Sequence, residues 1–439
     1  MNTNRRNFIK KSALAGIGLG AFPTILKAGT LGANEKITVG LIGCKGMGFS
    51  NLKTFLDKPN VECAALCDVD SNVLNERAAE TEKIQGKKPV LFADYRKLLE
   101  QKDIDTVIVG TPDHWHCLQM VDAVAAGKDV YCEKPLGNTI EECNVMVNAA
   151  KRYNKVVQVG QWQRSDPHWR DAVQYLHEGN IGRIRSVKVW SNVGWKGSIP
   201  VVPNEPVPQG VDYDMWLGPA EKRPFNVNRF HFTFRWFWDY AGGLMTDWGV
   251  HLLDYALFGM NQYVPNSIMS VGGKYAFPND AMETPDTLTA VYDFGDFGVI
   301  WEHTIGIDGA QFKKRDHGLA FVGEYGTLVV DRGGWEVIPE EKSVQSKEGF
   351  EGMPHQKSTG KGLSLHVENF LKCVKTREKP NCDIETAAHI ARFAHLGNIS
   401  YRLGRKLDWD GDKQKFKNDK EADAMASANY RKPWVLPKV

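Results

Sequence analysis

The sequence predicts an α/β protein with an N-terminal doubly wound Rossmann domain and a C-terminal α+β domain built on a large, mostly antiparallel open sheet. Three observations predict this fold. Between residue 36 and about residue 160, short apolar runs alternate with helix-like stretches, as in a parallel sheet covered on both faces. A glycine-rich turn closes the first run. Beyond residue 160 the runs alternate polar and apolar residues, which is typical of antiparallel strands with one covered face.

Five apolar runs and four helix-like stretches define the Rossmann domain, which we assign to residues 34–160. The expected strands are 37–42, 61–67, 106–109, 129–132 and 156–159, and the expected helices are 74–82, 95–101, 117–126 and 140–152. The second domain is assigned to residues 161–404, with strands at 185–190, 287–294, 299–305, 320–322 and 327–330 and helices at 247–258, 365–376 and 384–403. Residues 405–439 form a polar tail whose terminal aromatic residues predict docking on the body.

The first 33 residues form a segment of their own. Arg5-Arg6 and the following Asn-Phe-Ile-Lys resemble a twin-arginine export signal, and the apolar run after them is too short and too rich in glycine for a good membrane span. The expected location is therefore the periplasm, with no membrane contact beyond the signal. Cleavage after Ala28 or Ala33, retention as an anchor, and a plain basic N-terminus all stay open.

Composition narrows the classes of partner. The 439 residues suffice for two domains, and 55 basic against 53 acidic residues leave a net charge of only +2, so no nucleic-acid partner is expected. Eight cysteines occur without a CxxC pair, which argues against a zinc ribbon and favours buried thiols.

The glycine-rich turn predicts the binding site of a dinucleotide. Gly43 and Gly48 occupy the first and third places of a GxGxxG motif, whereas Lys45 stands where the second glycine normally admits the pyrophosphate. Asp68 follows Gly48 by twenty residues at the end of the second strand, where a carboxylate accepts from ribose hydroxyls and repels a 2′-phosphate. NAD is therefore favoured over NADP, while a helix N-cap is the alternative role for Asp68. Gly46 and Met47 complete the expected phosphate turn.

Two later strand ends reach the same edge of the sheet, where ligands of doubly wound folds bind. The candidates for cofactor contact there are Thr111, Pro112, His114, His116, Glu133 and Lys134. The HxH pair could also chelate a metal, but no carboxylate or cysteine stands nearby at matching spacing, so we predict none.

Asp247 and His251 predict the reacting site. They stand four residues apart in an expected helix and so share one face of it. A histidine that titrates near neutral pH can take the proton of a hydroxyl while hydride leaves the same carbon. A capping aspartate and a packed histidine are an equally acceptable interpretation.

Together these motifs resemble the glucose–fructose oxidoreductase, inositol dehydrogenase and rhizopine-catabolism (Gfo/Idh/MocA) family. The resemblance covers about residues 36–405, and the tail looks like that of an exported subgroup. It implies a catalytic set in which Lys134 binds and polarises the reacting hydroxyl, His251 is the acid/base, and Asp247 orients the substrate or supports the charge. It also implies a cis bond before Pro135. Lys45 departs from the family's glycine loop.

A carbohydrate substrate has separate support. Eight of the thirteen tryptophans lie between residues 160 and 250, and aromatic faces can stack on sugar rings, although for any one of these tryptophans a place in the core or in an interface is the preferred interpretation. The candidate substrate-binding residues are Trp162, Gln163, Arg164, Trp195, His231, Arg235 and His366.

These features lead to an NAD-dependent oxidoreductase of a sugar or glycoside. Because folded export would carry NAD along, we expect it to be tightly held. One alternative is a redox-neutral NAD-dependent glycosidase, which the resemblance also allows, and another is a sugar-binding protein without activity. A sheet with one uncovered face favours a homo-oligomer.

Overall fold

Six parallel strands form the sheet at the start of the described chain, which in this computed structural model comprises residues 36–309, 311–342, 344 and 347–439. The predicted export segment lies outside these residues. The strands are β1 (Ile37–Ile42), β2 (Val61–Cys67), β3 (Val90–Phe92), β4 (Thr106–Val109), β5 (Asp129–Cys132) and β6 (Val157–Val159), in the order β3-β2-β1-β4-β5-β6. The order reverses between β1 and β4, and this confirms the predicted Rossmann sheet.

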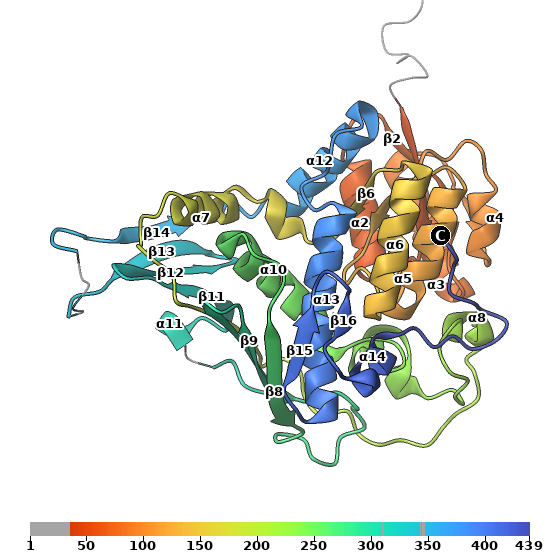
Figure 1. The fold of residues 1–439 in the computed structure, drawn as a ribbon. Helices are drawn as coiled ribbons and strands as arrows, with labels where there is room; N and C mark the ends of the chain where they lie inside the picture. Colours follow the sequence, from red (N-terminus) through yellow and green to blue (C-terminus); the bar gives the residue numbers. More distant parts are fainter. Residues whose placement is uncertain (1–35, 310, 343, 345–346) are drawn as a thin grey trace, which may run out of the picture. The chain divides into compact units, whose positions relative to one another are not determined.

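Helices connect these strands and cover the sheet (Figure 1). They are α2 (Met47–Leu56), α3 (Ser71–Gln85), α4 (Tyr95–Leu99), α5 (Asp113–Ala125) and α6 (Ile140–Tyr153). Local sequence sets their ends. The Asp70 carboxylate caps α3 by accepting from the backbone N–H groups of Asn72 and Val73, and Thr139 with Glu142 forms a capping box on α6.

A second sheet of ten strands follows in the described part of the chain. Its order is β14-β13-β12-β11-β7-β10-β9-β8-β15-β16, in which β7 and β10 are parallel and the other pairs antiparallel. The bounds are β7 (Ser186–Val193), β8 (Ser267–Gly273), β9 (Thr287–Asp293), β10 (Gly298–Ile305), β11 (His317–Val322), β12 (Gly326–Asp331), β13 (Gly334–Pro339), β14 (Met353–Lys357), β15 (Leu407–Asp410) and β16 (Lys415–Phe416). The predicted mostly antiparallel open sheet is confirmed.

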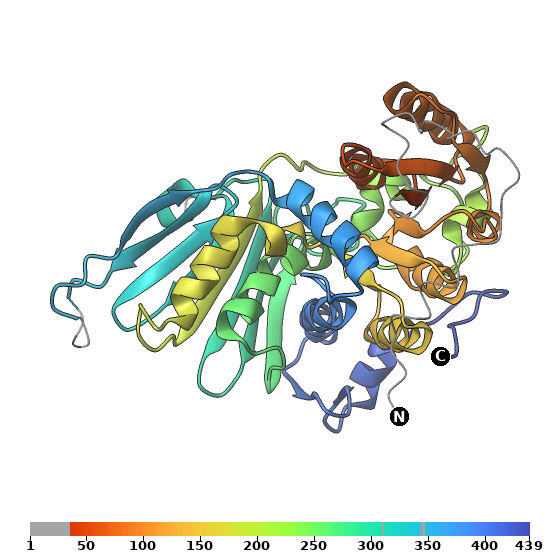
Figure 2. The ribbon, with the colours of Figure 1, turned by 90° about the horizontal axis from the view of Figure 1, so that it is seen from above.

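One face of this sheet is covered by helices. Figures 1 and 2 show α7 (Pro167–His177) and α10 (Gly249–Met260) over the strands, and α13 (Ile384–Leu403) packs against α10 and β8. The core between helices and sheet contains the fully buried side chains of Trp169, Tyr255, Tyr292 and Phe393. The other face carries apolar side chains in solvent, since Met269 is 42% and Val271 is 62% exposed.

The remaining elements are short or belong to both halves. They are α8 (Tyr213–Leu217), α9 (Gly243–Asp247), α11 (Gln311–Lys314), α12 (Gly362–Thr376), α14 (Lys420–Ala426) and the 3-10 turns η1 (Trp162–Ser165), η2 (Val227–Arg229) and η3 (His231–Trp236). Although α12 lies in the range assigned to the second domain, its Val367 and Phe370 belong to the same core as β1 and α2. Residues from Ile37 to Val439 accordingly form one compact unit.

The tail after residue 405 returns to the Rossmann helices (Figure 1). β15 adds to the edge of the large sheet, the Tyr430 hydroxyl donates to Glu142 at 2.7 Å, and the Trp434 ring meets that of Trp115 at 4.9 Å. All eight cysteines are free and buried, as the sequence predicted. Among the described helices, none combines the length and apolarity that crossing a membrane requires.

Of the predicted helices, only 384–403 has the predicted bounds, and two of the differences affect the site. The expected helix 117–126 starts at Asp113, because the φ of Pro112 suits the residue before a first turn, so His114 and His116 lie on α5 rather than in a loop. The expected helix 247–258 is two helices, α9 and α10, which meet at Trp248. A 3-10 bond from the N–H of His251 to the carbonyl of Trp248 joins them.

Candidate functional site

A cavity of about 380 Å³ lies at the carboxyl ends of the Rossmann strands, where the strand order reverses. That volume is within the range of small-molecule sites. Nine of the twelve predicted cofactor residues line it, namely Gly43, Lys45, Gly46, Met47, Asp68, Thr111, Pro112, Glu133 and Lys134. Arg235, His231 and Asp247 approach it from the second half of the chain.

Glycines build the floor of this cavity. A Cβ on Gly43 would lie 2.7 Å from the backbone of Gly110, and one on Gly48 would lie 2.1 Å from the carbonyl oxygen of Gly43. Gly48 therefore does not line the cavity but lets α2 pack against the turn. Gly46 has φ +54° and open space around it, and it precedes α2 without any side-chain cap. The N–H groups of this first turn are thus free to donate to a phosphate.

Lys45 does not block the turn. Its side chain is exposed at the cavity wall, and the positive φ that a phosphate turn requires is provided by Gly46 one residue later. The shift of the glycine by one position explains how the turn tolerates a lysine at the usual place of the second glycine. The fit of the turn to a pyrophosphate is therefore intact.

Asp68 stands at the end of β2 beside this turn and is not a helix cap, since Asp70 caps α3. Its carboxylate accepts from the backbone N–H groups of Cys44 at 2.7 Å and Asp70 at 2.9 Å. Burial raises its pKa, although these two bonds oppose the effect. Each oxygen keeps a second acceptor position, which suits ribose hydroxyls.

Lys134 and Asp247 join the two halves of the chain at the cavity wall. The Lys134 ammonium donates to Oδ1 of Asp247 at 2.6 Å and to the Asp247 carbonyl at 3.1 Å, and the pair is 11% and 17% exposed. Arg235 approaches the same oxygen at 3.4 Å. Burial alone would raise the pKa of Asp247, but the charges of Lys134 and Arg235 hold it well below its usual value. The third N–H of the ammonium is left for a ligand. The bond between Lys134 and Pro135 is cis, as predicted.

Asp113 lines the cavity and is not among the residues that the sequence predicted. It stands in the first turn of α5, 7% exposed, on the wall shared with Lys134 and Asp247. Burial raises its pKa to about 8 against the opposing charges of Lys134 and Arg235. Its carboxyl group is therefore largely protonated at neutral pH and can donate a hydrogen bond.

His251 lies one turn beyond Asp247, beside the cavity rather than on its wall. It is 7% exposed, its ring centroid is 6.4 Å from that of Trp162, and its Nδ1 has no hydrogen-bond partner among the described residues. Burial lowers its pKa well below the usual value, and the positive charges of Lys134 and Arg332 add to the effect. The imidazole is consequently neutral at pH 7, and the predicted titration of this histidine near neutral pH is wrong because burial and two positive charges disfavour its protonated form.

A loop from the second half covers the cavity with aromatic side chains. Arg235 stacks on the rings of Phe232 and Phe234, which both line the cavity, and the ring of His231 lies 3.0 Å from Oδ2 of Asp70. The sequence carries no motif for this loop. Of the substrate-binding residues predicted from the sequence, His231 and Arg235 line the cavity.

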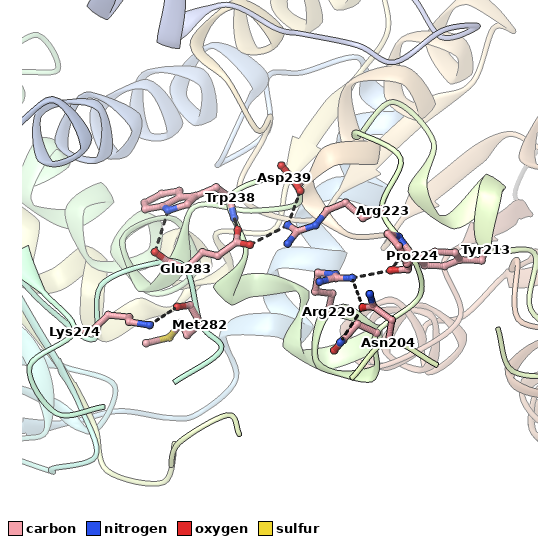
Figure 3. Close-up of polar contacts among 11 residues, drawn as sticks. Asn204, Tyr213, Arg223, Pro224, Arg229, Trp238, Asp239, Lys274, Met282 and Glu283 are labelled. Atoms are coloured by element: carbon pink, nitrogen blue, oxygen red, sulfur yellow. Dashed lines mark hydrogen bonds and ion pairs between the residues drawn. The ribbon is translucent and has the colours of Figure 1, made fainter. Parts of the chain in front are cut away.

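Polar contacts hold this loop in place (Figure 3). Arg223 bridges Asp239 at 2.7 Å and Glu283 at 2.9 Å, and Glu283 also accepts from the backbone N–H of Trp238. Since Arg223 precedes the loop and Trp238 and Asp239 follow it, these bonds tie the segments before and after the loop to each other and to the segment that carries Glu283.

The structure places the other predicted residues away from the cavity. His114 contacts the carbonyl of Trp216 at 3.0 Å, and His116 lies between the carbonyls of Pro135 and Thr111 at 2.7 and 2.9 Å. Burial lowers the pKa of both histidines to about 4. Neither histidine lines the cavity, and both connect α5 to neighbouring segments through backbone carbonyls. The prediction missed this because the local sequence does not indicate which face of α5 points toward the cavity.

Four substrate candidates have the same outcome. Arg164 makes a buried bidentate ion pair with Asp254, and His366 lies between Oγ of Ser165 and the carbonyl of Val159. Gln163 is fully buried, and Trp195 is 62% exposed beside Phe232. None of the four lines the cavity. Trp162 does not line it either, but its ring contacts that of His251, which lies beside the cavity.

This arrangement defines a class of protein: an oxidoreductase fold whose Rossmann half binds NAD. Residues 37–161 match the oxidoreductase family model for an NAD-binding Rossmann fold, and residues 185–295 and 356–436 match that family's C-terminal alpha/beta domain. The chain belongs to the Gfo/Idh/MocA oxidoreductase family.

Individual named proteins are also similar to this chain. The glycosyl hydrolase family 109 protein 1 of Shewanella sp. (strain ANA-3) is 31% identical over 175 residues, which are 35% of this chain and 38% of that protein. The match therefore spans 38% of the relative's length. Among solved structures, a levoglucosan dehydrogenase in complex with NADH and levoglucosan has a TM-score of 0.67 at 18% identity, covering 85% of this chain and 99% of that one. The myo-inositol 2-dehydrogenase of Lactobacillus plantarum has a TM-score of 0.63 at 18% identity, covering 85% and 100%.

Proposed function

We propose that this protein is an NAD-dependent oxidoreductase that oxidises a ring hydroxyl of a sugar or glycoside. The observation that carries the proposal is the Lys134–Asp247 ion pair on the wall of the cavity that the glycine turn begins. An ammonium with one free N–H beside a neutral histidine is suited to an alcohol, because the hydroxyl oxygen can be bound and its proton taken at the same place.

Lys134, Asp247 and His251 have separate roles in this reaction. Lys134 binds the reacting hydroxyl oxygen and stabilises the negative charge that develops on it. Asp247 keeps the ammonium in position through two contacts, and His251 accepts the hydroxyl proton. Bound NAD would supply the acceptor of the hydride that leaves the carbon.

NAD rather than NADP is proposed because of Asp68, whose carboxylate at the cavity wall would repel a 2′-phosphate. We expect the wild-type protein to bind NADH at least about 10-fold more tightly than NADPH. Asp68→Ala should bring the two dissociation constants, measured by fluorescence titration, within about threefold of each other. Unchanged discrimination in the variant would contradict the assignment.

Tight retention of the cofactor is the second part of the proposal. Mass spectrometry of the supernatant from acid-denatured, extensively dialysed protein should detect NAD in near-stoichiometric amount. A dinucleotide-free protein that binds NAD only weakly would refute tight retention without refuting the dehydrogenase.

A redox-neutral NAD-dependent glycosidase is the second candidate, and the similarity to a glycosyl hydrolase family 109 protein favours it. In that reaction the oxidised ring carbon acidifies the neighbouring C–H, the glycosidic oxygen leaves, water adds, and the hydride returns to the sugar. Aryl glycosides separate the two candidates: aglycone release without an added electron acceptor favours the glycosidase, and accumulated reduced cofactor favours the dehydrogenase.

A sugar-binding protein without activity would have no use for the Lys134 and His251 arrangement. If neither aglycone nor reduced cofactor forms with any sugar while sugars still bind, that third function is the correct one.

Export and pairing remain proposals. Arg5-Arg6 supports export to the periplasm by the twin-arginine route, and replacing both by lysine should keep the protein in the cytoplasmic fraction. The uncovered sheet face supports a homo-oligomer, because Met269 lies opposite Val291 in the ladder of β8 and β9 and both are exposed. Met269→Lys should lower the mass measured by sedimentation equilibrium if this face pairs.

A further inference from the structure

Arg332 is a charged residue near the reacting pair that the proposed chemistry does not use. It stands in the tight turn between β12 and β13, far in the chain from both His251 and His366, and its guanidinium lies 4.4 Å from the ring of Trp248 and 5.1 Å from that of Trp162. Trp248 follows Asp247 directly, and Trp162 meets His251. The guanidinium is therefore one aromatic ring away from both reacting residues.

The turn that carries Arg332 is fixed by its neighbours. Oδ1 of Asp331 accepts from the backbone N–H groups of Gly333 and Gly334, and Oδ2 accepts an ion pair from Arg315 at 2.6 Å. Both oxygens of the nearest carboxylate are thus occupied. The position of Arg332 follows from this rigid turn rather than from an ion pair of its own.

No carboxylate neutralises Arg332. Across the described residues no ion pair within 4.0 Å reaches its guanidinium, and its buried Nε has no hydrogen-bond acceptor. The carboxylate of Asp316 contacts His317, and Oδ1 of Asp247 is bound by Lys134. Burial lowers the pKa of Arg332, with the negative charges of Asp247 and Asp316 opposing it. A half-buried guanidinium whose buried Nε has no acceptor is stabilised when an anion reaches it.

The stacking leaves the donors of Arg332 available. A guanidinium that lies over an aromatic face keeps its N–H groups in its own plane, and that fork matches two oxygens of a carboxylate or sulfate. The charge and the fork of Arg332 together select an anionic group on the ligand.

We propose that Arg332 binds an anionic substituent, carboxylate or sulfate, on the sugar that the protein oxidises. The substrates are accordingly uronates or sulfated sugars rather than neutral ones. This inference rests on the proposed function, since it names the substrate class of the same site. Arg332 contacts the substrate away from the reacting carbon, so its contribution is expected mainly in KM.

The test compares matched sugars with the NAD-loaded protein. The pairs are D-glucuronate with D-glucose, D-galacturonate with D-galactose, and D-glucose 6-sulfate with D-glucose, followed through the absorbance of reduced nicotinamide. We expect one acidic member to exceed its neutral partner at least about 100-fold in kcat/KM, since a bidentate charge-assisted contact provides that much discrimination. A preference for glucuronate or galacturonate assigns a carboxylate, and a preference for the 6-sulfate assigns a sulfate.

Variants then connect the preference to the residue. Arg332→Gln should reduce the acidic-to-neutral ratio in kcat/KM to within about threefold, and Arg332→Lys should restore part of the ratio. Arg402→Gln is the matched control, because Arg402 also stacks on a tryptophan, Trp238, at 4.9 Å, and that ring lies beside Tyr401 rather than beside His251. Equal loss for both members of a pair in Arg332→Gln would show a purely structural stack and overturn the inference.

A binding measurement separates this inference from the proposed function. The same sugars are titrated against the NAD-loaded protein by tryptophan fluorescence, which requires no turnover. If kcat/KM for hydride transfer is as high with neutral sugars as with acidic ones, the inference is wrong and the proposed oxidoreductase function stands. Selective binding of an acidic sugar that Arg332→Gln abolishes, without any reduction of NAD, keeps the inference and overturns the oxidoreductase.

Discussion

Replacing Lys134 by methionine tests the central step of the proposed reaction. Methionine keeps most of the length and apolar contact of the side chain and removes only the charge and its donors. In the wild-type protein two N–H groups of the ammonium are bound by Asp247 and the third is free for the substrate. The variant therefore loses the group that stabilises negative charge on the reacting oxygen.

The size of the effect follows from that contact. A preorganised donor to a developing oxyanion contributes about 2.7–4 kcal/mol, so kcat should fall about 10²- to 10³-fold. Stability should change less. Breaking a buried ion pair costs about 3–5 kcal/mol, but this pair is 11% and 17% exposed and Asp247 keeps Arg235 at 3.4 Å. We expect about 1–3 kcal/mol, or a decrease in Tm of about 1–4 °C for a chain of this length.

The assay measures kcat and KM from the absorbance of reduced nicotinamide, with bound NAD quantified by mass spectrometry and Tm by circular dichroism. Lys128→Met is the matched control, because Lys128 is 5% exposed and its ammonium donates to the carbonyls of Gln101 and Ile104, away from the cavity. Turnover by Lys134→Met within about threefold of wild type, with NAD still bound, would refute the catalytic role. An equal loss of turnover in Lys128→Met would show that the effect is general destabilisation.

Three further substitutions test other parts of the site and core. Burial raises the pKa of Asp113 to about 8, so the stability that its protonated form contributes is fully present below about pH 4 and is lost as the pH rises through 8; Asp113→Asn should flatten the pH dependence of the free energy of unfolding, measured in urea between pH 6 and pH 9, and an unchanged slope contradicts the burial argument. Gly48→Ala should lower both Tm and NAD content, since its Cβ would meet the carbonyl oxygen of Gly43 at 2.1 Å, and a normal Tm would mean that the turn is loose. Arg164→Met should lower the free energy of unfolding by about 3–5 kcal/mol without changing KM, because it leaves Asp254 buried and unpaired; a raised KM at unchanged stability would instead restore Arg164 as a substrate ligand.

Local pattern was sufficient for most of the fold. The strands at 37–42, 61–67, 106–109 and 129–132 have the predicted bounds, because a buried parallel strand is a continuous apolar run that ends where polar or glycine residues begin. The phosphate turn was also readable, since glycines at Gly43 and Gly48 are required by close backbone contact. The helix predicted at 247–258 was less accurate, because the change of direction at Trp248 depends on packing and not on a helix-breaking residue.

Only part of the candidate site could be predicted from the sequence. Chain order placed Asp68, Thr111 and Glu133 at one sheet edge, since the carboxyl ends of parallel strands meet there. The pairing of Lys134 with Asp247, 113 residues apart, was implied by resemblance alone, because no local period connects the two.

The order of the elements, the Rossmann turn and the residue types at the edge of its sheet could be predicted from local sequence, because each depends on neighbours within a few residues. Which polar side chains face the cavity depends on the packing of the whole chain. Arg164 and His366 bind buried partners. The guanidinium of Arg332, in a hairpin turn that carries no sequence motif, has no ion-pair partner among the described residues and lies beside the reacting pair. The physical reason is that a charge is satisfied or left free by groups distant in the chain, and those groups meet only when the sheets and helices have packed.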